Sequence, residues 1–241
     1  MTDLDQAYPD VVRLEPGRAG YPASVAAAFG AQAPVLTCRG NGELLQRAGI
    51  AFCGSRKASD TGLATARDCA DQVAQAGLVA VSGNAAGVDR AAHLAALQAG
   101  GLTILVLPEG MDRFRIRRDL KAGWDWSRVL VISQFPADAV WRGDRAMTRN
   151  RLIIALSRAM IVIEAGETGG TLNAGLATLE SGKPLFVARY RDIADRAPGN
   201  ARLLEMGGQP LSRSRQTGRA SFQRVLDMVE ASPPPSASAQ Q

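Results

Sequence analysis

The chain has 241 residues, of which 46% are hydrophobic, so it is long enough for one large domain with a buried core. Its 28 basic and 23 acidic residues give a net charge of +5. The chain has a single histidine and three cysteines without C-x-x-C spacing, which argues against a metal site. There is no run of 18 apolar residues and no signal-peptide pattern, so we expect a cytoplasmic protein without membrane span, metal or cofactor.

The two ends of the chain differ in composition from its centre. Residues 1–20 are polar and interrupted by glycine and proline, which predicts an N-terminal extension. Residues 231–241 are rich in proline and serine, which predicts a disordered tail. Between them, residues 21–230 are expected to form a single domain, whose first strand candidate is 34–38.

Strands and helices alternate along this domain. The further strand candidates are 50–53, 78–82, 102–107, 128–132, 160–164 and 184–188, and the helix candidates are 60–76, 87–99, 149–157 and 170–181, with one more helical piece within 200–229. The strand candidates are continuous apolar runs, which are typical of strands buried on both faces of a sheet. This order predicts an α/β fold, an open and mostly parallel sheet with helices on both faces.

Three of the strand candidates end in a glycine turn that leads into a helix. The turns begin at Gly54, Gly83 and Gly166. Backbone N–H groups at such a helix start can hold an anion, and parallel neighbouring strands would place all three turns along one edge of the sheet. Several anion-binding turns in a row suit a ligand with several phosphates, either a nucleotide or a nucleic acid strand.

The turns also carry hydroxyl groups, and the first carries cations, which together can grip a phosphate. The candidate phosphate-binding residues are Gly54, Ser55, Arg56 and Ser59 in the first turn and Gly169, Gly170 and Thr171 in the third. The alternative at both places is a tight turn without a ligand. No G-x-G-x-x-G fingerprint for a dinucleotide is present.

The second turn contains Ser82 and Gly83 and leads into a helix with Asp89 and His93 on one face. A Ser-His-Asp catalytic arrangement is one interpretation of these residues. Because Asp89 is placed to cap a helix start and nothing marks Ser82 as a nucleophile, we expect Asp89 and His93 to be structural. Ser82 and Gly83 then count among the phosphate-binding candidates.

Basic residues are concentrated between residues 111 and 158, a stretch that contains eleven basic and five acidic residues. Such clustering is typical of a surface that binds a polyanion. Within this stretch, Arg149, Asn150 and Arg151 are predicted to begin a helix, with two guanidinium groups for phosphate and an amide for a base edge. The alternative is a solvated basic helix start, which the helix dipole disfavours unless an anion is present.

Taken together, these segments resemble the DprA/Smf family of DNA-processing proteins of natural transformation, over about residues 21–212. The matching segments are Gly54–Ser59 (G-S-R-x-x-S), Val81–Leu97 (V-S-G-x-A-x-G-x-D-x-x-A-H-x-x-A-L), Ser133–Pro136 (S-x-x-P), Arg149–Ser157 (R-N-R-x-I-x-x-L-S) and Val162–Ala165 (V-x-E-A). The resemblance implies an extended Rossmann-like domain that is not an enzyme. It implies a homodimer that binds single-stranded DNA in a basic pocket and helps load the RecA recombinase.

By this resemblance Arg56 is a main phosphate contact, and Lys183 is a further basic position. The chain departs from the family at Gln134, where an acidic residue is usual, and at Ala146-Met147, which replaces an aromatic–proline pair. The resemblance therefore supplies no base-stacking side chain at that position. We expect neither the N-terminal helical extension nor the C-terminal winged-helix domain that some members have.

A second resemblance supports a different function. The LOG phosphoribohydrolases share the fold, and their P-G-G-x-G-T-x-x-E turn aligns with Glu167–Ala174. Ala174 stands where their catalytic acid would be, which argues against hydrolysis of a nucleoside monophosphate. A nucleotide-binding sensor or a LOG-like enzyme is therefore the alternative to a DNA-binding protein.

Overall fold

Nine strands join into one sheet across the residues that the computed structural model describes, which are 8–190, 196–214 and 216–231. Their order in the sheet is β1-β2-β6-β5-β4-β3-β7-β8-β9. The strands are β1 (Val11–Leu14), β2 (Leu36–Gly40), β3 (Gly49–Cys53), β4 (Val79–Ser82), β5 (Leu102–Val106), β6 (Val129–Ser133), β7 (Ala159–Val162), β8 (Leu185–Ala188) and β9 (Gln209–Leu211).

The sheet from β6 to β9 is parallel, and β2 and β1 add an antiparallel margin beside β6. Every residue of β4, β6, β7 and β8 is buried, as the apolar runs predicted. The fold class expected from the sequence, an open and mostly parallel α/β sheet, is confirmed.

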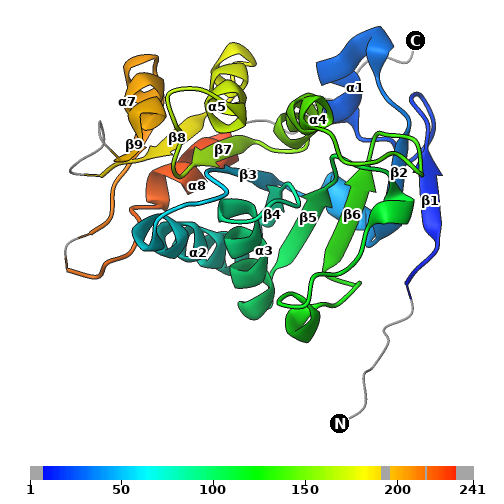
Figure 1. The fold of residues 1–241 in the computed structure, drawn as a ribbon, viewed down its shortest axis with the longest axis horizontal. Helices are drawn as coiled ribbons and strands as arrows, with labels where there is room; N and C mark the ends of the chain where they lie inside the picture. The colour runs from blue at the N-terminus through cyan, green and yellow to red at the C-terminus, as the bar shows by residue number, and fades with distance from the viewer. Residues whose placement is uncertain (1–7, 191–195, 215, 232–241) are drawn as a thin grey trace.

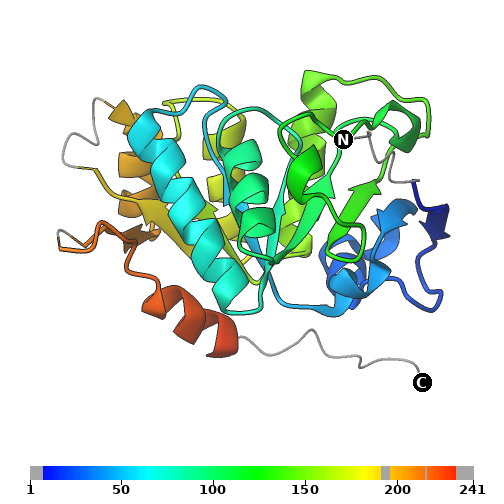
Figure 2. The same ribbon diagram turned by 90° about the horizontal axis from the view of Figure 1, so that it is seen from below.

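Helices cover both faces of the sheet, as Figures 1 and 2 show. One face carries α1 (Ala23–Phe29), α4 (Gly143–Ala155), α5 (Gly170–Glu180) and α7 (Pro198–Glu205), and the other carries α2 (Asp60–Gln75), α3 (Val88–Gln98) and α8 (Gln223–Ala231). Short 3-10 turns lie at Gly30–Gln32, Gly42–Gln46, Met111–Arg113 and Lys121–Gly123. Each face of the sheet thus has its own apolar core.

The structure differs from the expected elements at both sheet margins. Residues 11–14 of the predicted N-terminal extension form the edge strand β1, and β9 lies within the segment expected to be helical. Both are short edge strands, and β9 contains Pro210, so neither has the long apolar run by which the central strands are found. The predicted tail lies almost wholly outside the described residues, because α8 ends at Ala231.

The helix α4 begins earlier than the sequence indicates. It starts at Gly143, so the prediction that Arg149, Asn150 and Arg151 begin a helix is wrong. The first turns of α4 are polar, and its buried apolar side chains start only at Leu152. In the part of the chain described, no helix has both the length and the apolar character needed to cross a membrane.

Candidate nucleic-acid interface

The three glycine turns lie next to one another at the carboxyl edge of the sheet. Their strands are neighbours, because β3 pairs with β4 on one side and with β7 on the other, in parallel. The first two turns touch, since the Val88 N–H donates to the Ser55 carbonyl at 3.3 Å. Gly87, with a φ of 77°, lies against the Ser55 and Arg56 carbonyls, where a Cβ would not fit. The sequence-based expectation of one shared edge is thereby confirmed.

Arg56 is exposed in the first turn, as is the neighbouring Lys57. Its guanidinium lies over the ring of Trp141, 5.3 Å from the ring centre. Within the described residues it makes no hydrogen bond or ion pair, so its N–H donors are free for an anion. A contact with an aromatic ring uses none of the N–H donors in a hydrogen bond to a protein oxygen, so the donors remain for a phosphate.

The N-terminus of α5 offers a second position for an anion. Gly169 precedes the helix without a capping side chain, and the first turn of α5 has no acidic residue. Gly169 and Gly170 are exposed, and Asn150 of α4 donates to the Gly170 carbonyl at 3.4 Å. The first N–H groups of α5 therefore remain available, at the positive end of the helix dipole.

Ser59 is committed to the structure of the first turn. Its hydroxyl donates to one carboxylate oxygen of Glu164 at 2.5 Å, and its N–H donates to the other at 2.9 Å. The same hydroxyl accepts from the Gly62 N–H and so caps α2. These bonds join the first and third turns and direct the buried charge of Glu164 toward α2.

Arg149 lies beneath the turns and is only 6% exposed. Its Nη1 donates to the Val106 carbonyl, and its guanidinium and the Asp89 carboxylate both lie against Gly83, where a Cβ would meet both groups. Burial lowers the pKa of Arg149, and the neighbouring Asp89 charge opposes that shift. The Asp89 carboxylate also accepts from the Ala85 N–H, so it orders the second turn.

His93 and Ser82 are also buried under the second turn. The His93 ring lies 2.7 Å from the Gly83 carbonyl through Nε2 and 2.7 Å from the Thr103 hydroxyl through Nδ1. Since a carbonyl can only accept, we assign the proton to Nε2, and burial lowers the pKa of His93, which keeps the ring neutral. The Ser82 hydroxyl donates to the Phe52 carbonyl at 2.7 Å and is not directed toward His93.

Two of the predicted basic contacts lie apart from these turns. Arg151 donates to the Ala28 carbonyl and stacks on Phe29, so its guanidinium is held against α1. Lys183 follows α5 at the opposite, amino edge of the sheet, where its ammonium donates to the Ile154, Ala155 and Ser157 carbonyls at the end of α4. The prediction that Lys183 belongs to the phosphate site is therefore corrected, because its ammonium caps the C-terminus of α4.

The site thus has an exposed rim and a buried floor, and we use these names below. The rim consists of Arg56, Lys57, Trp141 and the α5 start at Gly169–Thr171; the floor consists of Ser82, Gly83, Asp89, His93 and Arg149. Sequence reasoning missed Trp141, whose signal was an aromatic residue directly before Arg142 and close to Arg145. Among the described residues no cluster of histidine, cysteine and acidic side chains could hold a metal ion.

Comparison with known protein families gives a match over most of the chain. A family model described as DNA recombination-mediator protein A matches residues 13–219. DNA processing protein DprA of Streptococcus pneumoniae is 34% identical over 179 residues, which are 73% of this chain and 63% of that protein. Protein Smf of Escherichia coli is 35% identical over 139 residues, 57% of this chain and 37% of that protein. The chain therefore spans less than two thirds of the length of either relative.

Solved structures give the same result. The X-ray structure of the Streptococcus pneumoniae protein superimposes with a TM-score of 0.77 at 30% identity, covering 92% of this chain and 74% of that one. DNA processing protein A of Helicobacter pylori, whose structure is described as showing a single-stranded DNA binding mode, gives a TM-score of 0.72 at 25% identity, with coverage of 92% and 95%. Both likenesses extend over nearly the whole domain.

Proposed function

This chain belongs to the DNA recombination-mediator protein A family, and on that premise we propose that it binds single-stranded DNA at the rim without catalysing a reaction on it. The observation that carries the proposal is the free Arg56 guanidinium after β3 and the uncapped α5 start after the neighbouring strand β7, at the same edge of the sheet. Two anion sites along one edge suit successive phosphates of a strand.

The buried floor supports a binding role over a catalytic one. Both His93 nitrogens are engaged, and the Ser82 hydroxyl is turned to a backbone carbonyl, so neither group is free to act on a ligand. Ala174, where the LOG enzymes have a catalytic acid, has no group that could move a proton. The comparisons with known proteins also do not favour the phosphoribohydrolase alternative.

Three further parts of the proposal come from the family. We propose that the chain acts in the cytoplasm on DNA taken up or processed for recombination, as in natural transformation. We also propose that it works as a homodimer and that it helps load RecA onto the bound strand. The names of its relatives, DNA processing proteins, support the general role.

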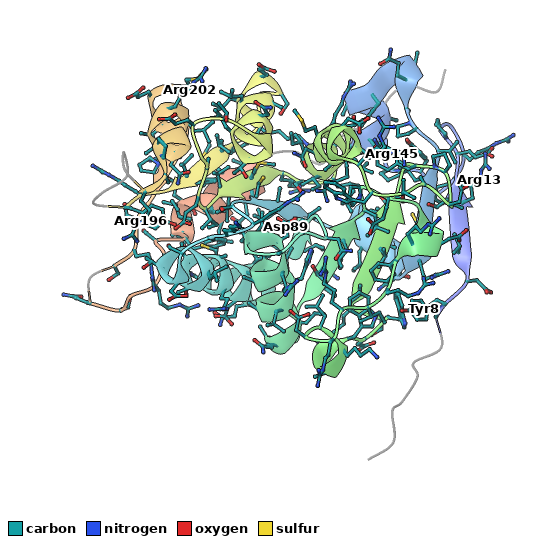
Figure 3. All side chains as sticks on the ribbon, viewed as in Figure 1. Tyr8, Arg13, Asp89, Arg145, Arg196 and Arg202 are labelled. Atoms are coloured by element: carbon teal, nitrogen blue, oxygen red, sulfur yellow. The ribbon has the colours of Figure 1, made fainter. Side chains whose placement is uncertain are left out.

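The test is a titration of a fluorescein-labelled oligo-dT by fluorescence anisotropy at about 50 mM and about 200 mM salt, the range over which phosphate contacts lose most affinity. We expect Arg56→Ala to weaken binding roughly tenfold and to reduce the salt slope by about 0.7, the contribution of one phosphate contact. Arg13→Ala is the matched control, because Arg13 is equally charged but lies on β1 at the far edge of the sheet (Figure 3).

The proposal is contradicted if the oligonucleotide does not bind, or if both substitutions weaken binding equally. Competition with AMP separates the alternative function. If the protein is a nucleotide sensor, AMP should displace the oligonucleotide at a concentration far below the total concentration of phosphate groups in the oligonucleotide. If it is a LOG-like enzyme, incubation with AMP should produce free adenine.

A further inference from the structure

Trp141 is a large aromatic side chain with 49% of its surface exposed, in the loop between β6 and α4. The two other tryptophans differ from it. Trp124 is buried, and Trp126 packs with Tyr8 and Trp124 beside Gly40, away from the rim. A single exposed aromatic side chain is common on protein surfaces, but this one lies against the guanidinium of Arg56, whose N–H donors have no partner among the described residues.

The loop that carries Trp141 is held in place on both sides. Ala139 is buried, and its carbonyl accepts from the Gly110 N–H at 2.9 Å. The carbonyl of Val140 accepts from Arg145 Nη1 at 2.6 Å, and Arg145 in turn lies over the Phe135 ring. Since α4 begins at Gly143, the backbone is ordered on either side of Trp141, and this places its side chain near Arg56.

Trp141 and Arg56 meet across the carboxyl ends of two other strands. Arg56 follows β3 and Trp141 follows β6, and β4 and β5 lie between these strands in the sheet. With about 4.8 Å between neighbouring strands, the ends of β3 and β6 are roughly 14 Å apart, so the turn after β3 and the loop after β6 together bridge that distance to bring the two side chains within 5.3 Å of each other. The ring therefore lies next to the guanidinium of Arg56, on the carboxyl side of the sheet.

An aromatic face beside a phosphate donor is the arrangement that binds a nucleotide of a single strand, with the base on the ring and the phosphate on the cation. Resting on the proposed function, we propose that Trp141 stacks a nucleobase of the bound strand while Arg56, aligned by the same ring, takes the adjoining phosphate. Stacking on a π face tolerates any base, so this contact adds affinity without sequence preference.

Tryptophan emission gives a direct test with unlabelled oligo-dT. Stacking of a thymine on Trp141 should quench part of the emission of the wild-type protein. In Trp141→Phe the remaining signal, from Trp124 and Trp126, should not change when the oligonucleotide is added. Equal quenching in both proteins would overturn the proposal.

Affinity gives an independent test. Trp141→Ala should weaken binding of oligo-dT roughly five- to a hundredfold, the range for one stacked base, while Trp141→Phe, which keeps a ring, should restore most of the affinity. Val140→Ala is the matched control, because Val140 is similarly exposed at 54% in the same loop but has no ring. It should leave the affinity unchanged.

An abasic oligonucleotide of the same length separates base contacts from phosphate contacts. The wild-type protein should bind the abasic oligonucleotide about as weakly as Trp141→Ala binds oligo-dT. The affinity of Trp141→Ala should be the same for the abasic oligonucleotide as for oligo-dT. If the wild type binds both ligands equally, or Trp141→Ala binds oligo-dT normally, the stacking role fails. Because Arg56→Ala would still weaken binding in that case, this failure is distinct from a failure of the proposed function.

Discussion

Arg56 and Arg149 lie at the same edge of the sheet in opposite surroundings. Arg56 is exposed on the rim and touches only the face of an indole ring, whereas Arg149 is buried on the floor against Gly83, Asp89 and the Val106 carbonyl. A buried guanidinium close to a carboxylate fixes a turn, and an exposed one with free donors can exchange water for phosphate. We therefore expect the floor to determine stability and the rim to determine binding.

The largest effect should come from Arg149→Met. It removes the hydrogen bond to the Val106 carbonyl and a positive charge that lies, with the buried Asp89 carboxylate, against Gly83. The lost bond and the uncompensated charge together should cost about 3 kcal/mol of the free energy of unfolding. Urea denaturation followed by circular dichroism measures the loss. Arg56→Ala, measured in parallel, should stay within about 0.5 kcal/mol of the wild type.

The double variant Arg149→Met/Asp89→Asn sharpens this comparison. If the cost arises from the unpaired carboxylate, removing that charge should recover part of the stability lost in the single variant. Equal stability of Arg149→Met and the wild type would contradict the structural role of the floor and return Arg149 to the candidates for DNA contact.

Ser59→Ala should have the next largest effect. The change removes the cap of α2 and one of the two hydrogen bonds from Ser59 to the buried Glu164, together about 2 kcal/mol of the free energy of unfolding. Ser55→Ala is the matched control, because among the described residues the one hydrogen bond of the Ser55 hydroxyl is local, from the Lys57 N–H. A loss of DNA affinity without a loss of stability in Ser59→Ala would show that this hydroxyl belongs to the rim.

Lys183→Met should have a smaller effect that depends on pH. Burial lowers the pKa of Lys183 to about 8 from 10.5, so between these values the unfolded chain binds more protons than the folded one. The contribution of Lys183 to the free energy of unfolding therefore rises with pH through this window and is lost as pH falls through about 8. We expect this rise, about 1 kcal/mol between pH 7.5 and 9.5, in the wild type and not in Lys183→Met.

The same variant also tests where the interface ends. Because Lys183 caps α4 at the amino edge of the sheet, Lys183→Met should bind oligo-dT like the wild type. Reduced affinity in a folded Lys183→Met protein would extend the interface beyond the rim.

The central sheet and its glycine turns could be predicted from the sequence, because buried parallel strands are long apolar runs and their turns need glycine. The roles of the basic residues could not. Arg56, Arg149, Arg151 and Lys183 look alike in a motif, and only the fold shows which guanidinium or ammonium meets a carbonyl, a carboxylate or a ring. Trp141 escaped prediction for the same reason, since its partner lies 85 residues away along the chain.

The smallest effect should come from Lys57→Gln on the rim. Lys57 is exposed next to Arg56, and its ammonium has no aromatic partner among the described residues, so it contributes only a screened point charge. We expect the affinity for oligo-dT to fall about two- to threefold and the free energy of unfolding to change by less than about 0.5 kcal/mol. If Lys57→Gln weakens binding as much as Arg56→Ala does, the rim attracts DNA through its overall charge. A clearly smaller loss would mean that the stacked guanidinium, held in one orientation by Trp141, is what distinguishes Arg56 from its neighbour.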